Sequence, residues 1–204
     1  MIAIIDYGVG NLTSIQNMFK KSGHDAIIGN DLKTVELSSK IVLPGMGAFD
    51  NCMNKLHESG LLPVIEKKVF GEKVPILGIC VGLQMLMQNS EEGNCAGLGW
   101  INGKTIRFNK NKMPVENKIP NMGWIDTQLK KESKLFYGLQ DSRFYFAHSY
   151  HVVPEIIADI VSTAVYGYEF VSGIEHDNIS GVQFHPEKSH RFGMQLLKNF
   201  AEKC

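Results

Sequence analysis

The sequence lacks an excess of either charge, and it lacks long hydrophobic runs. Its 21 basic and 21 acidic residues cancel to a net charge of zero, whereas a nucleic-acid-binding protein normally has a basic face or a high isoelectric point. No apolar run approaches the length of ~20 residues that a membrane span needs. The start, M-I-A-I-I-D-Y, is too short and too acidic for a signal peptide and indicates a first strand. We therefore expect a cytoplasmic protein.

Cysteine is also scarce, and no two cysteines form a C-x-x-C pair. A reducing compartment disfavours disulfides, and the histidines do not cluster with the cysteines at the spacing of metal ligands. The sequence therefore predicts no disulfide framework, no metal site and no cofactor. Most unpaired cysteines are small buried hydrophobic residues, and we expect this of Cys52, Cys95 and Cys204.

The first ninety residues alternate between strand and helix patterns. Apolar, β-branched segments predict strands at residues 2–6, 40–43 and 74–79. Apolar residues at helical spacing predict a helix capped by Asn11 and closed by Gly23, and further helices at 49–57 and 61–70. Alternation of this kind predicts a parallel sheet that is covered by helices on both faces.

The second half of the chain has a different pattern. It predicts two or three strands between residues 100 and 128, a strand at 143–148, a hairpin of 169–175 with 180–184, and a C-terminal amphipathic helix. No repeat or linker separates the halves, and 204 residues suit one sizeable domain. We therefore predict a single α/β domain over residues 1–204, with an open, mostly parallel sheet flanked by helices and extended by antiparallel strands.

Cys80 differs from the other cysteines in its position. The stretch L-G-I-C-V-G-L-Q at 77–84 places it at the carboxyl end of a predicted parallel strand, the edge at which open α/β sheets bind ligands. The flanking Gly78 and Gly82 are typical of a tight elbow that presents a nucleophile, and the amino end of the next helix favours the thiolate. Cys80 is therefore a candidate nucleophile, although the same glycines also suit ordinary packing of a strand against a helix.

The stretch G-V-Q-F-H-P-E-K-S at 181–189 supplies a candidate base. Residues two apart in an extended backbone point the same way, and Pro186 disfavours helical geometry at His185, so His185 and Glu187 are predicted to project to one side. His185 could take the thiol proton while Glu187 orients the ring. With an ordinary histidine pKa of about 6.5, the rate should fall below that pH. Taken alone, H-P-E is also a common surface turn.

A thiolate that attacks a carbonyl needs hydrogen-bond donors for the oxyanion. The segment P-G-M-G at 44–47 follows the strand that we expect beside the Cys80 strand. Its residues Gly45, Met46 and Gly47 could turn a backbone N–H toward the developing charge, and the amide of Val81 is the second candidate donor. An ordinary tight turn explains P-G-M-G about equally well.

Together these stretches resemble the class I glutamine amidotransferases of the Cys-His-Glu type, and the resemblance covers nearly the whole chain. The motifs in order are D-Y-G-V-G-N at 6–11, P-G-M-G at 44–47, G-I-C-V-G-L-Q at 78–84, M-G-W at 122–124, H-S-Y at 148–150 and D-N-I-S-G-V-Q-F-H-P-E-K-S at 177–189. The cysteine and H-P-E motifs are specific to the class. The M-G-W and G-V-G-N segments are similar to the glutaminase subunits of imidazole glycerol phosphate synthase, an enzyme of histidine biosynthesis.

The resemblance implies a role for each matched residue. Cys80 would attack the side-chain amide of glutamine, His185 would act as base and then as acid, and Glu187 would orient the imidazole, with ammonia and glutamate as products. The substrate contacts that it implies are Gln84, Ser149 and Tyr150. It also implies that P-G-M-G must reorient before the oxyanion hole is complete, so that a partner switches the glutaminase on.

The partner implied by the resemblance is a (β/α)₈ barrel cyclase, joined to the glutaminase as a heterodimer. The cyclase would use the ammonia to make imidazole glycerol phosphate and an aminoimidazole carboxamide ribonucleotide. The residues that would face or gate this partner are Asn11, Met122, Trp124 and Lys188. Each also has an ordinary interpretation, because Asn11 could only cap a helix, Lys188 could be a solvated charge, and Met122 and Trp124 could belong to the core.

Two positions depart from the family pattern and leave the ammonia acceptor open. Asn121 stands where members usually carry histidine, and Ile125 stands where they usually carry asparagine, and both are expected to flank the partner face. The main alternative is a related glutaminase that supplies ammonia for amidation of a bacterial surface sugar. A stand-alone cysteine hydrolase and a non-catalytic regulatory subunit are weaker alternatives, because the Cys-His-Glu set is intact. A dinucleotide loop at 6–11 is disfavoured, because Thr13 replaces the third glycine of its motif.

Overall fold

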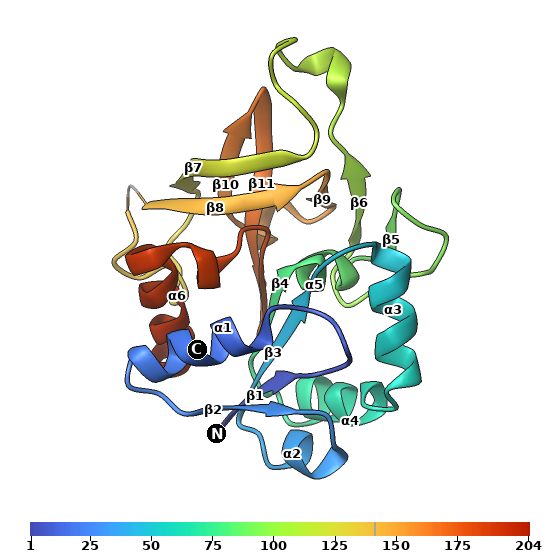
Figure 1. The fold of residues 1–204 in the computed structure, drawn as a ribbon, viewed down its shortest axis with the longest axis vertical. Helices are drawn as coiled ribbons and strands as arrows, with labels where there is room; N and C mark the ends of the chain where they lie inside the picture. The colour runs from blue at the N-terminus through green and yellow to red at the C-terminus, as the bar shows by residue number, and fades with distance from the viewer. Residues whose placement is uncertain (141) are drawn as a thin grey trace.

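The computed structural model describes residues 1–140 and 142–204 and is built around one large sheet (Figure 1). Its nine strands lie in the order β2-β1-β3-β4-β12-β11-β10-β7-β8. In chain order these are β1 (Ile2–Ile5), β2 (Ala26–Gly29), β3 (Lys40–Gly45), β4 (Ile76–Cys80), β7 (Asn121–Leu129), β8 (Ser142–His148), β10 (Ile160–Tyr166), β11 (Tyr168–His176) and β12 (Ile179–Val182). A second sheet consists of β5 (Asn89–Ser90), β6 (Gly103–Arg107) and β9 (Tyr150–Pro154).

One half of the large sheet is parallel. Strands β2, β1, β3, β4 and β12 pair in the same direction. All residues of β1, β4 and β12 are buried, as expected for strands that have helices on both faces. The carboxyl ends of β3 and β4 meet at one edge, where Gly45 lies opposite Cys80.

The other half of the large sheet is antiparallel. From β12 it continues through β11, β10, β7 and β8, each pair running in opposite directions. Burial alternates along β8, because one face of this half packs on the core and the other faces outward. The predicted α/β sheet with an antiparallel extension is confirmed, but the sheet is mixed and not mostly parallel, because the extension adds four strands to the five parallel ones.

The helices lie on both sides of the parallel half. They are α1 (Leu12–Lys21), α2 (Leu32–Glu36), α3 (Phe49–Glu58), α4 (Leu62–Glu66), α5 (Val81–Met85) and α6 (His190–Lys203). Helix α1 packs with α6, whereas α3 packs with α5 and α2 with α4, and Figure 1 shows α1 and α6 apart from α3. In α6, Leu196, Leu197 and Phe200 are fully buried on the predicted apolar stripe.

Several local predictions need correction. Asn11 stands at the cap position of α1, but its side chain makes no capping hydrogen bond. Strand β3 runs on through Pro44 to Gly45, and proline is tolerated there because pairing with β1 has already ended at Val42. The predicted helix over 61–70 ends in a π-helical turn at Lys67–Gly71.

Some short elements have no counterpart among the sequence predictions. These are β2, α2, β5, β9 and β10. β2 and α2 span only 4 and 5 residues, so they are too short to show a period. The cysteine predictions hold in part, since Cys52 is fully buried while Cys95 and Cys204 are only half-buried.

Candidate active site

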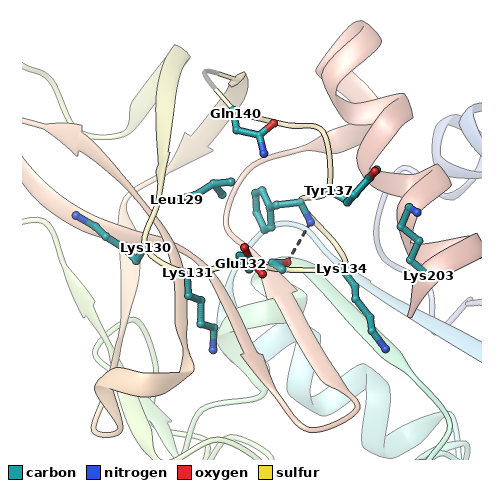
Figure 2. A pocket seen from close by; sticks show the side chains of 10 residues that line it. Leu129, Lys130, Lys131, Glu132, Lys134, Tyr137, Gln140 and Lys203 are labelled. Atoms are coloured by element: carbon teal, nitrogen blue, oxygen red, sulfur yellow. Dashed lines mark hydrogen bonds between the residues drawn. The ribbon is translucent and has the colours of Figure 1, made fainter.

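Two cavities of the molecule differ in their chemistry. The larger, of about 890 Å³, lies at the end of β7, beside the loop that follows it and the end of α6 (Figure 2). Figure 2 shows lysine side chains spread around it, and none of its described lining residues is a cysteine or a histidine. The smaller, of about 310 Å³, lies at the carboxyl ends of β3 and β4 and is lined by both Cys80 and His185. Because covalent acyl transfer needs a nucleophile beside a base, the smaller cavity is the candidate active site.

Cys80 stands at a sharp turn between β4 and α5. Its φ of 57° and ψ of −111° are rare for a residue with a side chain. A Cβ on Gly78 would come within 2.8 Å of the Gly82 carbonyl oxygen, and a Cβ on Gly82 would come within 2.0 Å of the Leu43 carbonyl oxygen. The backbone therefore forms the predicted elbow, and both positions need glycine because neighbouring backbone fills the space of a side chain.

His185 reaches the thiol from the next strand of the sheet. β12 lies beside β4 with Val182 opposite Ile79, so the chain continues past Cys80 and brings His185 to the same cavity. Cys80 is among the groups that raise the pKa of the His185 imidazole, so the two side chains lie close together in this cavity. The ring nitrogen Nδ1 lies 2.8 Å from Oε1 of Glu187, and the side chains of His185 and Glu187 are 5% and 3% exposed. A sulfur, an imidazole and a carboxylate thus form one buried row.

Glu187 reaches the imidazole by a different route from the predicted one. The backbone of His185 is extended, but residues Pro186–Lys188 form a 3₁₀ turn. The carboxylate lies on the same side as the ring because this turn folds back, and strand alternation plays no part. Pro186 suits the first position of the turn, since its fixed φ is helical and its missing N–H would have no partner there.

The charge on His185 is set by burial and by its two neighbours, Cys80 and Glu187. Burial lowers the pKa of the imidazole, but the interactions with Cys80 and Glu187 outweigh burial and raise the pKa to about 10. The ring is therefore protonated at neutral pH. The expectation of an ordinary pKa for His185 is wrong, because the sulfur and the carboxylate stabilise the charged ring.

The three expected substrate contacts, Gln84, Ser149 and Tyr150, all line the cavity. Gln84 Nε2 donates to the Tyr150 carbonyl oxygen at 3.1 Å and to Gln183 Oε1 at 3.2 Å. Gln84 Oε1 is buried and has no hydrogen-bond partner among the described residues. A buried acceptor without a donor is costly, so the Gln84 amide is only partly satisfied by the described residues.

Three residues of the site have no counterpart among the sequence predictions. Glu92 and His148 line the cavity, and Gln183 Nε2 lies 3.9 Å from the Cys80 sulfur. The Glu92 carboxylate accepts a hydrogen bond from the Phe49 N–H at 3.0 Å, and burial raises its pKa. His148 and Gln183 belong to the motifs H-S-Y and G-V-Q-F-H-P-E, so the motifs signalled them, whereas no local pattern marks Glu92.

Asn121 belongs to the wall behind the cavity and not to an exposed face. It is 1% exposed, and its Nδ2 lies 3.2 Å from Nε2 of His148, whose Nδ1 lies 2.7 Å from the Tyr150 carbonyl oxygen. A carbonyl only accepts, so Nδ1 carries the proton and Nε2 accepts from the Asn121 amide. Burial lowers the pKa of His148 to about 3, so the ring is neutral. Asn121, which stands where the family usually carries histidine, therefore holds the neutral His148 ring in place in the cavity wall.

The expected oxyanion residues gather at the cavity. Met46, Gly47 and Val81 line it. Gly45 packs beside them, where a Cβ would come within 2.3 Å of the Gly82 nitrogen. The glycine is required because the end of β3 lies directly against the start of α5.

The Val81 N–H faces a carbonyl of the protein itself. At the start of the β3–β4 ladder, the Ile41 N–H donates to the Pro75 carbonyl oxygen, and the register continues without a shift to Gly45 opposite Cys80. In a parallel ladder every second residue of a strand bonds in the same way, so Gly45 repeats the pattern of Ile41. The N–H one residue past its partner Cys80, that of Val81, is therefore directed at the Gly45 carbonyl oxygen. One expected oxyanion donor is therefore turned away from the cavity in this conformation.

Of the four positions expected at a partner face, only Lys188 lines the cavity. Met122 is 64% and Trp124 38% exposed, which excludes the interpretation of both as core residues. Trp124 stacks on the His190 ring with centroids 5.3 Å apart. Asn11 is half-buried at the start of α1, which packs on the 3₁₀ turn that contains Lys188.

The described residues contain neither a metal-binding cluster nor a membrane-spanning helix. Within residues 1–140 and 142–204, no three His, Cys, Asp or Glu side chains are grouped so that they could hold a metal ion. Across the same part of the chain, no helix combines the length and the apolarity that crossing a bilayer requires.

Comparison with protein families gives one match over nearly the whole chain. The family described as "Glutamine amidotransferase class-I" matches residues 3–204. Similar sequences include "Imidazole glycerol phosphate synthase subunit HisH 2" of Methanococcus maripaludis, which is 50% identical and covers 100% of both chains. The protein of the same name in Pseudomonas aeruginosa is 45% identical over 99% of both chains. Subunit HisH of Sulfurimonas denitrificans is 45% identical over 99% of this chain and 98% of its own.

Solved structures give the same fold at lower sequence identity. A putative GMP synthase protein from Thermoplasma acidophilum has a TM-score of 0.71 at 22% identity and covers 98% of this chain and 90% of its own. A structure described as a glutamine amidotransferase has a TM-score of 0.68 at 16% identity, covering 97% of this chain and 99% of its own. At these identities the likeness concerns the fold alone.

Proposed function

The chain belongs to the class-I glutamine amidotransferase family, and on this basis we propose that it hydrolyses glutamine to glutamate and ammonia through a thioester on Cys80. The observation that carries the proposal is the row of Cys80, His185 and Glu187 at one cavity, with Nδ1 of His185 2.8 Å from Glu187. This row supplies a nucleophile, a proton carrier and a group that orients the carrier, as acyl transfer requires.

The chemistry follows from the protonated state of His185. The sulfur attacks the side-chain carbonyl carbon of glutamine, and the carbonyl electrons move onto oxygen. The imidazolium then gives its proton to the departing nitrogen, which leaves as ammonia while the thioester forms. Water attacks the thioester, His185 takes up one of its protons, and the sulfur leaves to release glutamate. Glu187 holds Nδ1 throughout, so that Nε2 is the nitrogen that faces the sulfur.

The cavity walls suit the two ends of a glutamine molecule. We assign Gln84, Ser149 and Tyr150 to substrate binding, with the unpaired Gln84 Oε1 as an acceptor for a substrate N–H. The carboxylate of Glu92, on the same cavity, fits the α-ammonium group of the substrate. Gly45, Met46, Gly47 and Val81 would form the oxyanion hole after the loop has changed conformation.

The relatives named as subunits of imidazole glycerol phosphate synthase support a partner for this chain. We propose that residues 1–204 act as one cytoplasmic glutaminase domain in a heterodimer with a (β/α)₈ cyclase, which uses the ammonia in histidine biosynthesis. Asn11, Met122, Trp124 and Lys188 would contact or gate that partner, and Lys188 also lines the cavity. The exposure of Met122 and Trp124 fits this role, since an interface core is rich in methionine and aromatic residues.

A different acceptor of the ammonia remains an alternative, with the same hydrolysis of glutamine. Two of the similar proteins carry the number 2 in their names, and a second subunit of one kind leaves room for a second acceptor, such as a bacterial surface sugar. Ile125 departs from the family pattern beside the expected partner face, and Asn121 departs from it in the wall behind the cavity. This alternative changes the partner and leaves the roles of Cys80, His185 and Glu187 unchanged.

The glutaminase reaction is tested with Cys80→Ala, assayed for ammonia release from glutamine with the cyclase subunit of the same organism present. We expect the variant to lose activity by several orders of magnitude and to keep its complex with the cyclase, and Cys95→Ala to behave as wild type. Glutamine hydrolysis retained in Cys80→Ala would exclude the mechanism.

The acceptor is tested by complementation of a histidine auxotroph that lacks this subunit. Growth with the wild-type chain, and no growth with Cys80→Ala, is the expected result. A well-folded wild-type chain that hydrolyses glutamine with a sugar-modifying partner but does not restore growth would favour the surface-sugar alternative.

A further inference from the structure

The turn at residues 92–95, whose first residue lines the cavity, is fastened to α3 by one carboxylate. Asp50 lies in the first turn of α3. The Asn94 N–H donates to Oδ2 of Asp50 at 2.9 Å, and the Cys95 N–H donates to Oδ1 at 3.0 Å. A Cβ on Gly93 would lie 1.9 Å from the same Oδ1, so the backbone of the turn lies directly against the carboxylate.

The start of this turn is held by the residue before it and by α3. Ser90 accepts from the Glu92 N–H through its hydroxyl oxygen at 3.1 Å and from the Gly93 N–H through its carbonyl oxygen at 3.4 Å. The Glu92 carboxylate accepts from the N–H of Phe49, the first residue of α3, at 3.0 Å. Asp50 is the next residue of that helix. The two carboxylates therefore join the turn and the helix at consecutive helix positions, and the place of Glu92 depends on the bonds that Asp50 makes.

The charges of these two carboxylates oppose each other. The two backbone N–H groups lower the pKa of Asp50, so it is charged at neutral pH. Burial raises the pKa of Glu92, and the nearby charge of Asp50 raises it further, against the effect of the Phe49 N–H. Repulsion would move a free Glu92 side chain away, so it is the backbone bonds that keep the pair together. A cation bound at Glu92 relieves this repulsion.

We propose that Asp50 is a positioning residue for recognition of the α-ammonium group of glutamine, because it holds the turn at 92–95 so that Glu92 faces the cavity. The proposal rests on the proposed glutaminase function. Asp50 is not among the described residues that line the cavity, so it acts through the turn. Without its carboxylate, the N–H groups of Asn94 and Cys95 lose their acceptor and the turn gains conformational freedom. Glu92 then faces the substrate for a smaller fraction of the time, which weakens binding and leaves the reaction itself unchanged.

The test is a double-mutant cycle on KM for glutamine, measured as ammonia release with the cyclase of the same organism bound. Asp50→Ala removes both acceptors. Its effect is bounded by that of losing the Glu92 charge itself, so KM should rise about three- to tenfold with kcat nearly unchanged. In the Glu92→Gln background the same substitution should change KM by less than about twofold, because the charge that Asp50 positions is already absent.

Asp31→Ala is the matched control. Asp31 caps α2, outside the cavity, by accepting from the Thr34 N–H at 3.0 Å. Its removal also deletes a bond from a backbone N–H to a carboxylate, and it should change neither kcat nor KM. Asp50→Asn keeps one acceptor oxygen, so it should give a smaller rise in KM than alanine, and it serves as the test if the alanine variant does not fold. Circular dichroism and thermal unfolding check the fold of each variant.

The outcomes separate positioning from a general structural role. An unchanged KM in Asp50→Ala, or a loss confined to kcat, would overturn the proposal. An equal rise in KM with and without Glu92→Gln would also overturn it, since Asp50 would then act independently of Glu92. An unchanged KM in Glu92→Gln alone would do the same, because no ammonium site would exist to position. A wild-type chain that releases no ammonia from glutamine with the cyclase bound would instead refute the glutaminase function itself, and the proposal with it.

Discussion

At the scale of single residues, the site depends on how three side chains share charge. His185 is buried between Cys80 and Glu187, and the pKa of its imidazole is raised to about 10. The second carboxylate oxygen of Glu187, Oε2, is buried and has no hydrogen-bond partner within the described part of the chain. The imidazole Nδ1 is therefore the one hydrogen-bond partner of this carboxylate within the described residues.

Removal of the Glu187 charge should change the pH dependence of the reaction. The pKa of His185 in the folded protein is raised to about 10. The imidazolium is therefore fully present at acidic and neutral pH and is lost as the pH rises through about 10. The wild-type rate should therefore hold from neutral pH to about pH 9 and then fall. Glu187→Gln removes a charge-assisted hydrogen bond and should move this fall by about one to two pH units toward lower pH.

The measurement is the pH profile of kcat for glutamine hydrolysis with the cyclase bound. Glu175→Gln, which neutralises a partly buried carboxylate outside the cavity, serves as the matched control and should leave the profile in place. An unchanged alkaline limb in Glu187→Gln would contradict the assigned pairing.

A second carboxylate, that of Glu92, is expected to act in substrate binding and not in the reaction itself. If Glu92 holds the α-ammonium group, Glu92→Gln removes the charge and keeps a similar shape, so KM for glutamine should rise roughly tenfold while kcat stays nearly constant. Steady-state kinetics measure both constants. The neighbouring Glu91→Gln, outside the cavity, should change neither. A loss confined to kcat would assign Glu92 a different role.

At the scale of secondary structure elements, the elbow is a close contact between β3, β4 and α5. Gly45, Gly78 and Gly82 each lie where a Cβ would meet backbone atoms within 3.0 Å. Backbone cannot yield as a flexible side chain can, so the three elements fix the nucleophile to the sheet. The same contact explains why Cys80 keeps an unfavourable φ.

Gly82→Ala should therefore destabilise the fold, because its Cβ would lie 2.0 Å from the Leu43 carbonyl oxygen. Overpacking of this kind costs roughly 1–3 kcal/mol, and the free energy of unfolding in denaturant measures it. Gly71→Ala is the matched control, since a Cβ there meets nothing within 4 Å. Equal stability of the two variants would show that the elbow can open at little cost.

At the scale of the whole molecule, the site lies where the parallel and antiparallel halves of the sheet join. β4 delivers Cys80, and β12, which pairs with both β4 and β11, delivers His185. The antiparallel half then supplies the wall of the cavity and the exposed side chains beside its mouth. Met122 lies opposite Ala147, a residue of the cavity.

Trp124 is the strongest candidate anchor of a partner on this surface. Trp124→Ala should weaken binding of the cyclase subunit by about 30-fold, because buried tryptophans at interfaces contribute about 2 kcal/mol or more. Isothermal titration calorimetry with the purified cyclase of the same organism measures Kd. Ile157→Ala removes another exposed apolar side chain, 81% exposed, and should bind as wild type. Binding unaffected by Trp124→Ala would move the interface elsewhere.

The sequence by itself determined the elements with local signals. The glycines around Cys80 predicted the nucleophile, and the H-P-E segment predicted His185 as its base. The apolar periods of β1, β4, α1 and α6 predicted an α/β sheet with an antiparallel extension. Such signals are local, because turn chemistry and hydrophobic period depend on residues that are close in sequence. The 3₁₀ turn at Pro186–Lys188 was missed although its consequence, Glu187 beside His185, was predicted.

Only the tertiary structure decided the charge on His185, the direction of the Val81 N–H, and the places of Glu92 and Asn121. Each of these depends on groups that come from separate strands and helices, so no short stretch of sequence carries the information. Burial and neighbouring charges set the pKa, and the register of β3 on β4 determines which carbonyl the Val81 N–H faces. The sequence determined which chemical groups are present, and folding determined their distances and their surroundings, on which their reactivity depends.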